Sequence, residues 1–274
     1  MNKIFAVTLV LLGTLSFSCR NKKTIDLNTV STKTDDASKT DTLKFTSSIR
    51  SILQDSKGNY WIGSHSEGLS LYDGSSFEYF TTENGLPDNQ VRSIKEDLNG
   101  NILIGTANGV SKFDGKSIRN LTPAIYGDQK DEWDKSINDL WFNAGVKEGV
   151  YNYNGNNVRY FEMPNHKLIK KSGVYQVTDI SKGKNNMIWF GTFSGVIGYN
   201  GTDFTIINDE TLGYDEEDAP LHIRSILEDS KGRLWIGNNG IGVLLKEGSS
   251  IVNFSEQHNL IHPTSTRRGE KSKP

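Results

Sequence analysis

Short apolar stretches separated by polar, glycine-containing turns recur along residues 43–262. Each recurrence contains an aromatic or apolar residue, then a second apolar residue and, in all but the third, glycine. The five motifs are Trp61-Ile62-Gly63, Leu103-Ile104-Gly105, Trp141-Phe142-Asn143, Trp189-Phe190-Gly191 and Trp235-Ile236-Gly237. They stand 42, 38, 48 and 46 residues apart. A period of this length indicates one supersecondary unit used several times.

Each unit reads as four short β-strands. In the first unit the pattern predicts strands over residues 49–53, 60–63, 69–72 and 77–80, and no helical periodicity competes with it. A turn dipeptide follows each motif: Asp73-Gly74, Asp114-Gly115, Asn154-Gly155, Asn200-Gly201 and Glu247-Gly248. Asp-Gly and Asn-Gly are the residue pairs that favour positive φ, so we expect type I′ hairpins here.

Four-stranded units of 40–45 residues are typical of propeller blades. The sequence therefore predicts an all-β fold, a β-propeller of about five four-stranded blades. Residues 43–46 resemble a fourth strand that precedes its own blade, and residues 251–254 give the fifth unit a fourth strand of its own. Either five blades close with a spare strand, or the ring is incomplete and the chain is truncated within a sixth blade. We favour five blades, because exposed strand edges promote unwanted pairing.

The repeat resembles that of the two-component regulator propeller family. Residues 223–237, Ile-Arg-Ser-Ile-Leu-Glu-Asp-Ser-Lys-Gly-Arg-Leu-Trp-Ile-Gly, follow the family's pattern, and residues 83–91 are similar to its link between blades. The third unit departs most, because residues 137–139 replace the usual turn and its first strand is hard to assign. The resemblance implies an extracytoplasmic sensor domain, often carbohydrate-responsive, like those of hybrid two-component kinases. The chain resembles the sensor half alone.

Residues 1–19 are predicted to be a signal segment outside the fold. Lys3 supplies a positive charge, and residues 4–15 form an apolar run that is too short to cross a hydrocarbon core of about 30 Å. The sequence Leu-Ser-Phe-Ser-Cys at residues 15–19 resembles a bacterial lipoprotein box, which implies a lipid on Cys19. The alternative is a plain secretory signal followed by a free thiol.

A lipid on Cys19 would make the membrane a partner of the chain. We expect an extracytoplasmic location, in the outer membrane of a Gram-negative bacterium and facing the periplasm, since no acidic run follows Cys19. Residues 20–42 are polar and are predicted to be a disordered tether. The propeller then occupies residues 43–262, and residues 263–274 form a polar tail.

The charge balance narrows the choice of partners. The chain has 31 Lys and Arg against 33 Asp and Glu, a formal charge of −2. Without a basic excess to neutralise phosphates, nucleic acid is not expected to bind. The single cysteine excludes a disulfide framework and any multi-cysteine metal site. We predict no cofactor.

The lengths of the connections indicate a binding face. Most variation lies between the fourth strand of one unit and the first strand of the next, at residues 124–132, 162–173 and 209–222. In a propeller these connections share a face with the loops between second and third strands, and insertions on one face are typical of a ligand site. Candidate binding residues on this face are Tyr126, His166, Tyr214, His222, His65, Asn108, Lys147, Phe193 and Asn239. They suit a polar small molecule such as a sugar or oligosaccharide; the alternative is a set of solvated loops.

Three arginines form a more specific pattern. Arg50, Arg92 and Arg224 are each the second residue of a predicted first strand. First strands line the centre of a propeller and begin at its binding face, so the three guanidinium groups could converge there on a carboxylate or phosphate, such as that of a uronic acid. The alternative is that this position belongs to the repeat and pairs with neighbouring carboxylates.

No catalytic residue is assigned from the sequence. None of the five histidines lies in a nucleophile or zinc motif, and no metal ligand is predicted. The acidic run at residues 215–218 lacks the spacing of a calcium loop. We interpret the chain as a ligand-binding or sensory module. The alternatives are a propeller lyase or hydrolase that uses a histidine and an acidic residue, such as His222 and Glu217, and a scaffold for a signalling or outer-membrane protein.

Two recurrent features are expected to be structural. The tryptophans of the motif, Trp61, Trp141, Trp189 and Trp235, are expected to pack between blades. Asp55, Asp97 and Asp229 each open the turn between the first two strands of a unit, where the side chain is expected to cap its own backbone.

Overall fold

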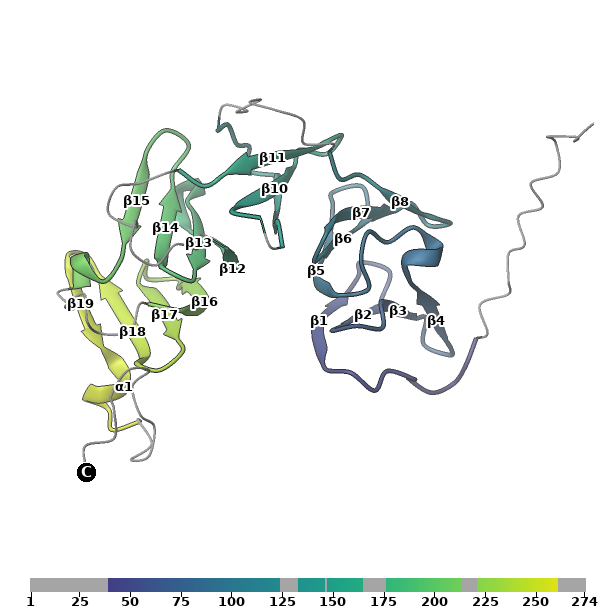
Figure 1. Ribbon diagram of the computed structural model, residues 1–274, viewed down its shortest axis with the longest axis horizontal. Helices are drawn as coiled ribbons and strands as arrows, with labels where there is room; N and C mark the ends of the chain where they lie inside the picture. Colours follow the sequence, from purple (N-terminus) through teal and green to yellow (C-terminus); the bar gives the residue numbers. More distant parts are fainter. Residues whose placement is uncertain (1–38, 124–132, 146, 165–175, 213–220, 261–274) are drawn as a thin grey trace, which may run out of the picture. The chain divides into compact units, whose positions relative to one another are not determined.

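The computed structural model describes residues 39–123, 133–145, 147–164, 176–212 and 221–260, and these form five antiparallel sheets in chain order (Figure 1). The first sheet contains β1 (Ile49–Gln54), β2 (Tyr60–Ser64), β3 (Leu69–Tyr72) and β4 (Phe77–Phe80). The second contains β5 (Val91–Glu96), β6 (Ile102–Thr106), β7 (Gly109–Phe113) and β8 (Ile118–Asn120). The third contains β9 (Leu140–Asn143), β10 (Gly149–Tyr153) and β11 (Val158–Glu162). The predicted all-β fold is confirmed.

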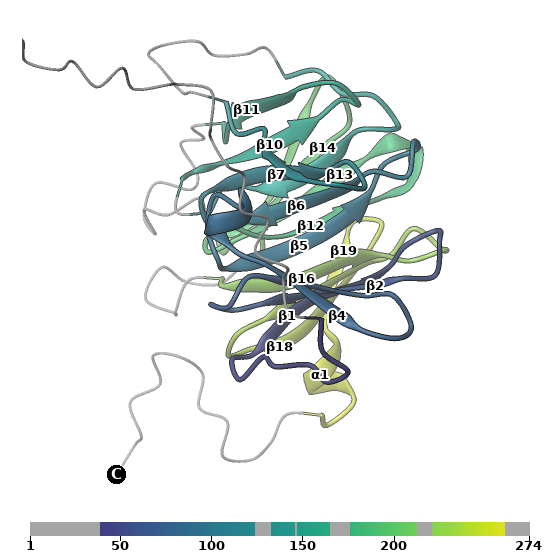
Figure 2. The same cartoon turned by 90° about the vertical axis from the view of Figure 1, so that its right-hand side faces the viewer.

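The fourth and fifth sheets again have four strands each. They contain β12 (Val177–Lys182), β13 (Ile188–Thr192), β14 (Gly195–Tyr199) and β15 (Phe204–Ile207), then β16 (Ile223–Glu228), β17 (Leu234–Asn238), β18 (Gly242–Glu247) and β19 (Ser250–Asn253). Short 3₁₀ turns, η1 (Thr82–Asn84), η3 (Lys184–Asn186) and η4 (Glu210–Leu212), lie between strands. Figure 2 shows the sheets from the side, with the one-turn helix α1 (Phe254–Gln257) following β19.

The hairpins between third and fourth strands differ from the predicted type I′ turns. In the first sheet Tyr72 pairs with Phe77, so four residues form the loop. The Asp73 carboxylate accepts the backbone N–H groups of Ser75 and Ser76, both at 2.9 Å, and only Gly74 adopts positive φ. The type I′ prediction was wrong because the side chain of the first turn residue caps the loop and keeps its own φ negative.

The turns between first and second strands agree with the prediction. The Asp55 carboxylate accepts the N–H groups of Lys57 and Asn59, and it also accepts the indole N–H of Trp61 at 2.9 Å. Asp229 repeats this pattern, including a 3.0 Å bond from the indole of Trp235. In each of these two sheets, one aspartate carboxylate therefore caps the turn and also holds the indole of the motif tryptophan in place.

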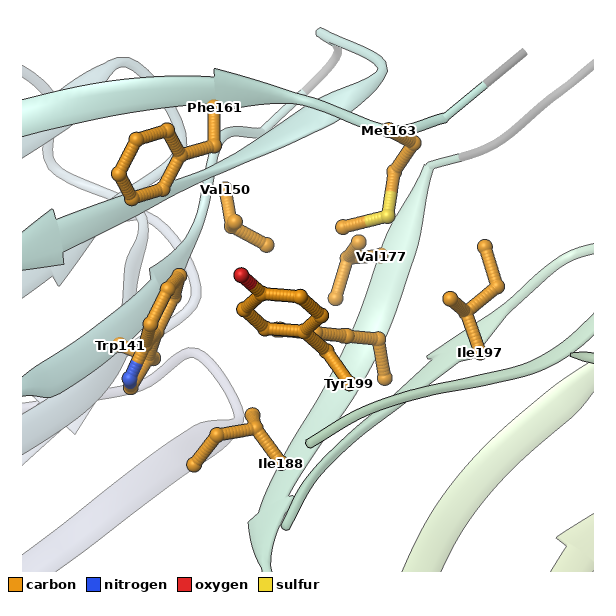
Figure 3. Close-up of a cluster of buried hydrophobic side chains, with 9 residues drawn as sticks. Trp141, Val150, Phe161, Met163, Val177, Ile188, Ile197 and Tyr199 are labelled. Atoms are coloured by element: carbon orange, nitrogen blue, oxygen red, sulfur yellow. The ribbon is translucent and has the colours of Figure 1, made fainter. Parts of the chain in front are cut away.

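Each sheet has two faces, and consecutive sheets pack through opposite faces. We call the face that contacts the next sheet along the chain the forward face, and the opposite one the rear face. In the first sheet the forward face carries Leu53, Trp61, Leu71 and Phe80, and these pack against the rear face of the second sheet, with Val91, Ile94, Ile102 and Ile104. Further clusters join the second sheet to the third, the third to the fourth and the fourth to the fifth. Figure 3 shows the cluster of the third and fourth sheets, where Trp141, Phe161 and Tyr199 lie together. The tryptophan prediction is confirmed for Trp61, Trp141 and Trp189.

The series of clusters has two ends. Among the described residues, no hydrophobic cluster joins the fifth sheet to the first. The rear face of the first sheet leaves Ile52 67% exposed, and the forward face of the fifth leaves Leu227 58% exposed. The described residues thus form propeller blades without a closed ring, which agrees with the incomplete ring that the sequence allowed.

The segment before β1 does not form the predicted outer strand at residues 43–46. Thr40 forms an isolated bridge with Phe77 of β4, and the backbone N–H of Lys44 donates to the hydroxyl of Tyr79 at 2.7 Å. Phe45 packs edge-on against Tyr79, with ring centroids 5.5 Å apart. The segment therefore lies along β4, the outer strand of the first sheet. Phe45 covers part of that sheet's rear face by packing on Tyr79.

Glu67 attaches this segment to the loop between β2 and β3. Its carboxylate accepts the N–H groups of Ser47 at 2.6 Å and Thr46 at 2.9 Å, and bonds from Ser47, then Thr46, lower the pKa of Glu67 from 4.5 to about 2. A folded-state pKa below the unfolded one means that the bonds stabilise the fold above pH 4.5 and are lost as the pH falls towards 2.

We therefore expect Glu67→Gln to lower the free energy of unfolding at pH 7, and we expect this difference from wild type to disappear by pH 2. Urea unfolding followed by circular dichroism at several pH values measures it. Glu83→Gln is the control, because the Glu83 carboxylate accepts no hydrogen bond from a described residue. A difference that stays constant with pH would contradict the assigned role of Glu67.

The third sheet has three strands in the described part of the chain, and Trp133, the first described residue before them, packs against this sheet. Trp133 stands eight residues before Trp141, the same separation as Leu53 and Trp61. Its ring stacks on Trp141 at 5.8 Å and on Phe161 at 5.0 Å, and it contacts the aromatic rings of the fourth sheet. Its indole N–H donates to the carbonyl of Glu162. Trp133 thus fills the position that a first-strand side chain takes elsewhere.

Candidate functional site

The arginine position of the repeat lies at a β-bulge. In the first sheet the register shifts between Ile49 and Ser51, so Arg50 has no partner across the ladder. The same shift occurs at Arg92, Thr178 and Arg224 in the other sheets that have a first strand. A bulge redirects the side chain of the extra residue, and bulges are frequent beside binding sites. The repeat thus presents one redirected side chain at the start of each first strand.

The loops between second and third strands lie at the same end as these bulges. The N–H of His65 donates to the carbonyl of Ser48, which precedes β1, at 2.8 Å. Ala107 bonds to Gln90 in the same way before β5, and Asn239 bonds to His222 before β16, both at 2.9 Å. In these three sheets the bonds place the loop residue after the motif beside the start of the first strand.

A row of polar side chains crosses the first three sheets at this end. The Nε of Arg50 donates to Nδ1 of His65 at 2.9 Å, and the amide nitrogen of Gln90 lies 3.3 Å from the same Nδ1. The amide oxygen of Gln90 accepts a 2.9 Å bond from Nε of Arg92, whose terminal nitrogen reaches the amide oxygen of Asn143 at 3.4 Å. We call Arg50, His65, Gln90, Arg92 and Asn143 the arginine row.

The arginine row carries positive charge that the protein does not neutralise by contact. Neither Arg50 nor Arg92 forms an ion pair with a carboxylate in the part of the chain that the structure describes. Burial lowers the pKa of Arg92 from its usual value, and the charge of Arg50 lowers it further, while Asp88 opposes both. Guanidinium groups are charged at neutral pH. Two guanidinium groups held close together without a bound carboxylate favour an anion.

A depression borders the row. Its volume is about 420 Å³, within the range of small-molecule sites, and Ser48, Ile49, Arg50 and His65 line it. Since Nε of Arg50 is bonded to His65, the terminal nitrogens of this guanidinium remain as donors towards the depression. The arrangement can hold a carboxylate through a planar pair of N–H groups, with polar groups of His65 and Ser48 beside it.

The other predicted site residues are not brought into this row. No hydrogen bond or ion pair of the described residues joins Arg224 to Arg50 or Arg92. Asn108 and Asn239 are exposed at the same end of their own sheets. Phe193 packs edge-on against His222, with ring centroids 4.3 Å apart. Tyr214, Tyr126, His166 and Glu217 lie outside the described residues. Arg50 and Arg92 are thus linked through His65 and Gln90, and the convergence of three arginines on an anion stays a prediction.

Two members of the row were not predicted from the sequence. Gln90 directly precedes β5, and Asn143 occupies the glycine position of the third motif. At that position in the first sheet a Cβ on Gly63 would come within 2.5 Å of Val91, so glycine permits close contact between sheets. The third motif departs from this rule, and its asparagine reaches Arg92 instead. In the sequence, the indication for Asn143 was therefore its departure from the glycine that the other four motifs carry.

The described residues show no metal-binding group. Across residues 39–260, gaps excepted, no three His, Cys, Asp or Glu residues gather in a way that could hold an ion. No helix in the same ranges is long and apolar enough to cross a bilayer.

Comparison with known proteins supports the repeat assignment. Residues 43–66 and 219–240 match the two component regulator propeller family. No curated protein matches the sequence significantly. Among solved structures, the extracellular domain of a putative one component system from B. thetaiotaomicron is 26% identical with a TM-score of 0.55, over 75% of this chain and 27% of that one. The present chain therefore spans about a quarter of that domain.

Two other similar structures are more distant in sequence. Virginiamycin B lyase from Staphylococcus aureus is 17% identical with a TM-score of 0.56, over 78% of this chain and 72% of the lyase. PorZ, a surface component of the type-IX secretion system of Porphyromonas gingivalis, is 16% identical with a TM-score of 0.51, over 75% of this chain and 33% of PorZ. At these identities the likeness concerns the fold alone, so the lyase or hydrolase alternative is neither supported nor excluded by it.

The five sheets, their packing in chain order and the two matched segments agree with one another. The chain is therefore a propeller protein, and two of its segments match two component regulator propeller repeats.

Proposed function

We propose that this protein is an extracytoplasmic ligand-binding module that recognises a small polar anion, a uronic acid or an oligosaccharide that contains one. The observation that carries the proposal is the pair Arg50 and Arg92, which are redirected by bulges and linked through His65 and Gln90. The likeness to an extracellular sensor domain supports a location outside the cytoplasm.

Recognition of the ligand would depend on the guanidinium N–H donors of the arginine row. A carboxylate accepts two parallel hydrogen bonds from a guanidinium group, a geometry that a lysine or an amide cannot reproduce. Arg50 lines the depression, and Gln90 together with Asn143 holds Arg92 in a fixed orientation. Orientation before binding reduces the entropy lost when the ligand is held. The hydroxyl groups of a sugar would then bond to His65 and Ser48 at the edge of the depression.

Anchoring by a lipid on Cys19 belongs to the same proposal and rests on the sequence of residues 15–19. A tether over residues 20–42 would hold the sheets near a membrane, where a signalling or outer-membrane protein could contact them. Metabolic labelling with a radioactive fatty acid tests the anchor, because Cys19→Ser should abolish incorporation while leaving the protein exported.

Titration calorimetry with glucuronate tests the binding site, with glucose as the neutral probe of similar shape. We expect glucuronate to bind and glucose to bind at least about tenfold more weakly, because charged hydrogen bonds contribute about 1.5–3 kcal/mol. Arg92→Gln should weaken glucuronate binding by about tenfold or more.

Arg224→Gln is the matched control for Arg92→Gln, since Arg224 has the same bulged position but lies outside the row. It should leave the dissociation constant within about twofold of wild type, a change of less than 0.5 kcal/mol. Equal binding of glucose and glucuronate, or an equal loss in both variants, would contradict the proposed site.

A further inference from the structure

The first and fifth sheets are near-copies of each other, and their residues correspond at a constant offset of 174. Ile52 matches Ile226, Leu53 matches Leu227 and Trp61 matches Trp235. The two sheets also share the bulge and the bond from the motif tryptophan to the turn aspartate. Each residue of one sheet therefore has a matched control in the other.

The two copies bury opposite faces. On the rear face, Ile226 is 4% exposed against the fourth sheet, whereas its counterpart Ile52 is 67% exposed. On the forward face, Trp61 is 2% exposed against the second sheet, whereas Trp235 is only half-buried and Leu227 beside it is exposed. The first and fifth sheets thus expose the two complementary halves of one interface, which is formed four times between the described sheets.

From this complementarity we infer that the forward face of the fifth sheet binds the rear face of the first sheet in a second copy of this chain. The partner is another copy because each copy carries both halves. Leu227 and Trp235 of one copy pack against Ile52 and Tyr60 of the next, as Leu53 and Trp61 pack against the second sheet within the chain. The interface is heterologous, head to tail.

The contacts between the first and second sheets serve as the template for this interface. There the carboxylate of Glu96 accepts the N–H of Ser56 at 2.8 Å. The counterparts at the chain's two ends are Gln54 and Ser230, which are exposed and form no side-chain hydrogen bond with a described residue. A polar bond between Ser230 of one copy and Gln54 of another would thus complete the pattern.

Close approach between sheets depends on the motif glycine. A Cβ on Gly63 would come within 2.5 Å of Val91, the first residue of the following sheet. A Cβ on Gly237 would meet only Ser225 of its own sheet. Gly237 therefore keeps open the place that Ile49 of a second copy would occupy. Because residues 40–46 lie along β4, the docking surface is the part of the rear face nearest β1 and β2.

Sedimentation equilibrium of the full-length chain with Cys19→Ser tests the inference. We expect association to increase with concentration up to about 100 μM, above the micromolar constants of weak standard-size interfaces. Ile52→Asp and Leu227→Asp should each abolish self-association, since each places a charge in one half of the interface. Both positions are exposed in one copy, so circular dichroism and the melting temperature should not change.

Mixing the two variants gives the sharpest result. The Leu227→Asp chain keeps an intact first sheet and the Ile52→Asp chain an intact fifth sheet, so a one-to-one mixture should form dimers and nothing larger. Leu98→Asp, which changes a residue 81% exposed in a turn, is the control that should associate like wild type. A wild-type chain that stays monomeric, variants that still associate, or a mixture that stays monomeric would each overturn the inference.

Discussion

Trp61→Ala is expected to lower the free energy of unfolding by about 3–5 kcal/mol, the usual cost of removing a buried tryptophan. Trp61 stacks on Phe80 and contacts Phe113 of the next sheet edge-on, at a centroid distance of 5.1 Å. Its loss also removes the indole bond to Asp55. Urea unfolding at low protein concentration, followed by circular dichroism, measures the change.

Trp235→Ala is the matched variant and should cost only about 1–2 kcal/mol, because less area is buried there. Trp235 bonds to Asp229 as Trp61 does to Asp55, but it faces the open end of the sheet series and contacts Phe254 and Arg233. Trp61→Phe separates the lost hydrogen bond from the lost packing. Equal costs for the two alanine variants would mean that both forward faces are covered alike, contrary to the packing described.

Trp133→Ala is expected to cost about 3 kcal/mol, although Trp133 lies outside every described strand. Its ring touches both the third and the fourth sheet, and its carbonyl accepts a 2.7 Å bond from the hydroxyl of Tyr199. Removing the side chain would leave a cavity between the third and fourth sheets. Thermal and urea unfolding both report it.

Ile137→Ala is the control within the same segment. Ile137 is exposed, so the substitution should change the free energy of unfolding by no more than about 0.5 kcal/mol. Trp133→Phe should recover most of the stability, since a smaller ring still contacts Trp141. If Trp133→Ala cost no more than Ile137→Ala, the third sheet would not depend on this residue.

The repeat pattern predicted most of the fold because each unit is locally consistent. The alternation over residues 49–80 gave the four strands of the first sheet within one residue of their observed ends. Asp55 and Asp229 were predicted to cap turns, and they do. These features depend on short-range contacts, which a sequence shows directly.

The errors concern positions where a side chain replaces a backbone interaction. Asp73 caps its loop and makes a type I′ turn unnecessary. Phe45 packs on Tyr79, so its segment covers a face instead of adding a strand. Trp133 could have been found from its eight-residue distance to Trp141, but its contacts with both sheets depend on packing between units.

The candidate site could be predicted only in part. The repeated position of Arg50 and Arg92 was visible, and the loop position of His65 placed it at the same end. The links through Gln90 and Asn143 were not visible, because they join residues of different units. No repeat pattern specifies such contacts, since they arise where the units differ from one another.

The most direct test of the proposed binding function is the ¹⁵N NMR spectrum of the arginine side chains during a glucuronate titration. The Nε–H signals of Arg50 and Arg92 should shift together and saturate at one dissociation constant, while that of Arg224 should not move. Assignment by the three single Arg→Gln variants identifies each signal. Unchanged signals for Arg50 and Arg92, or an equal shift of Arg224, would contradict the anion site.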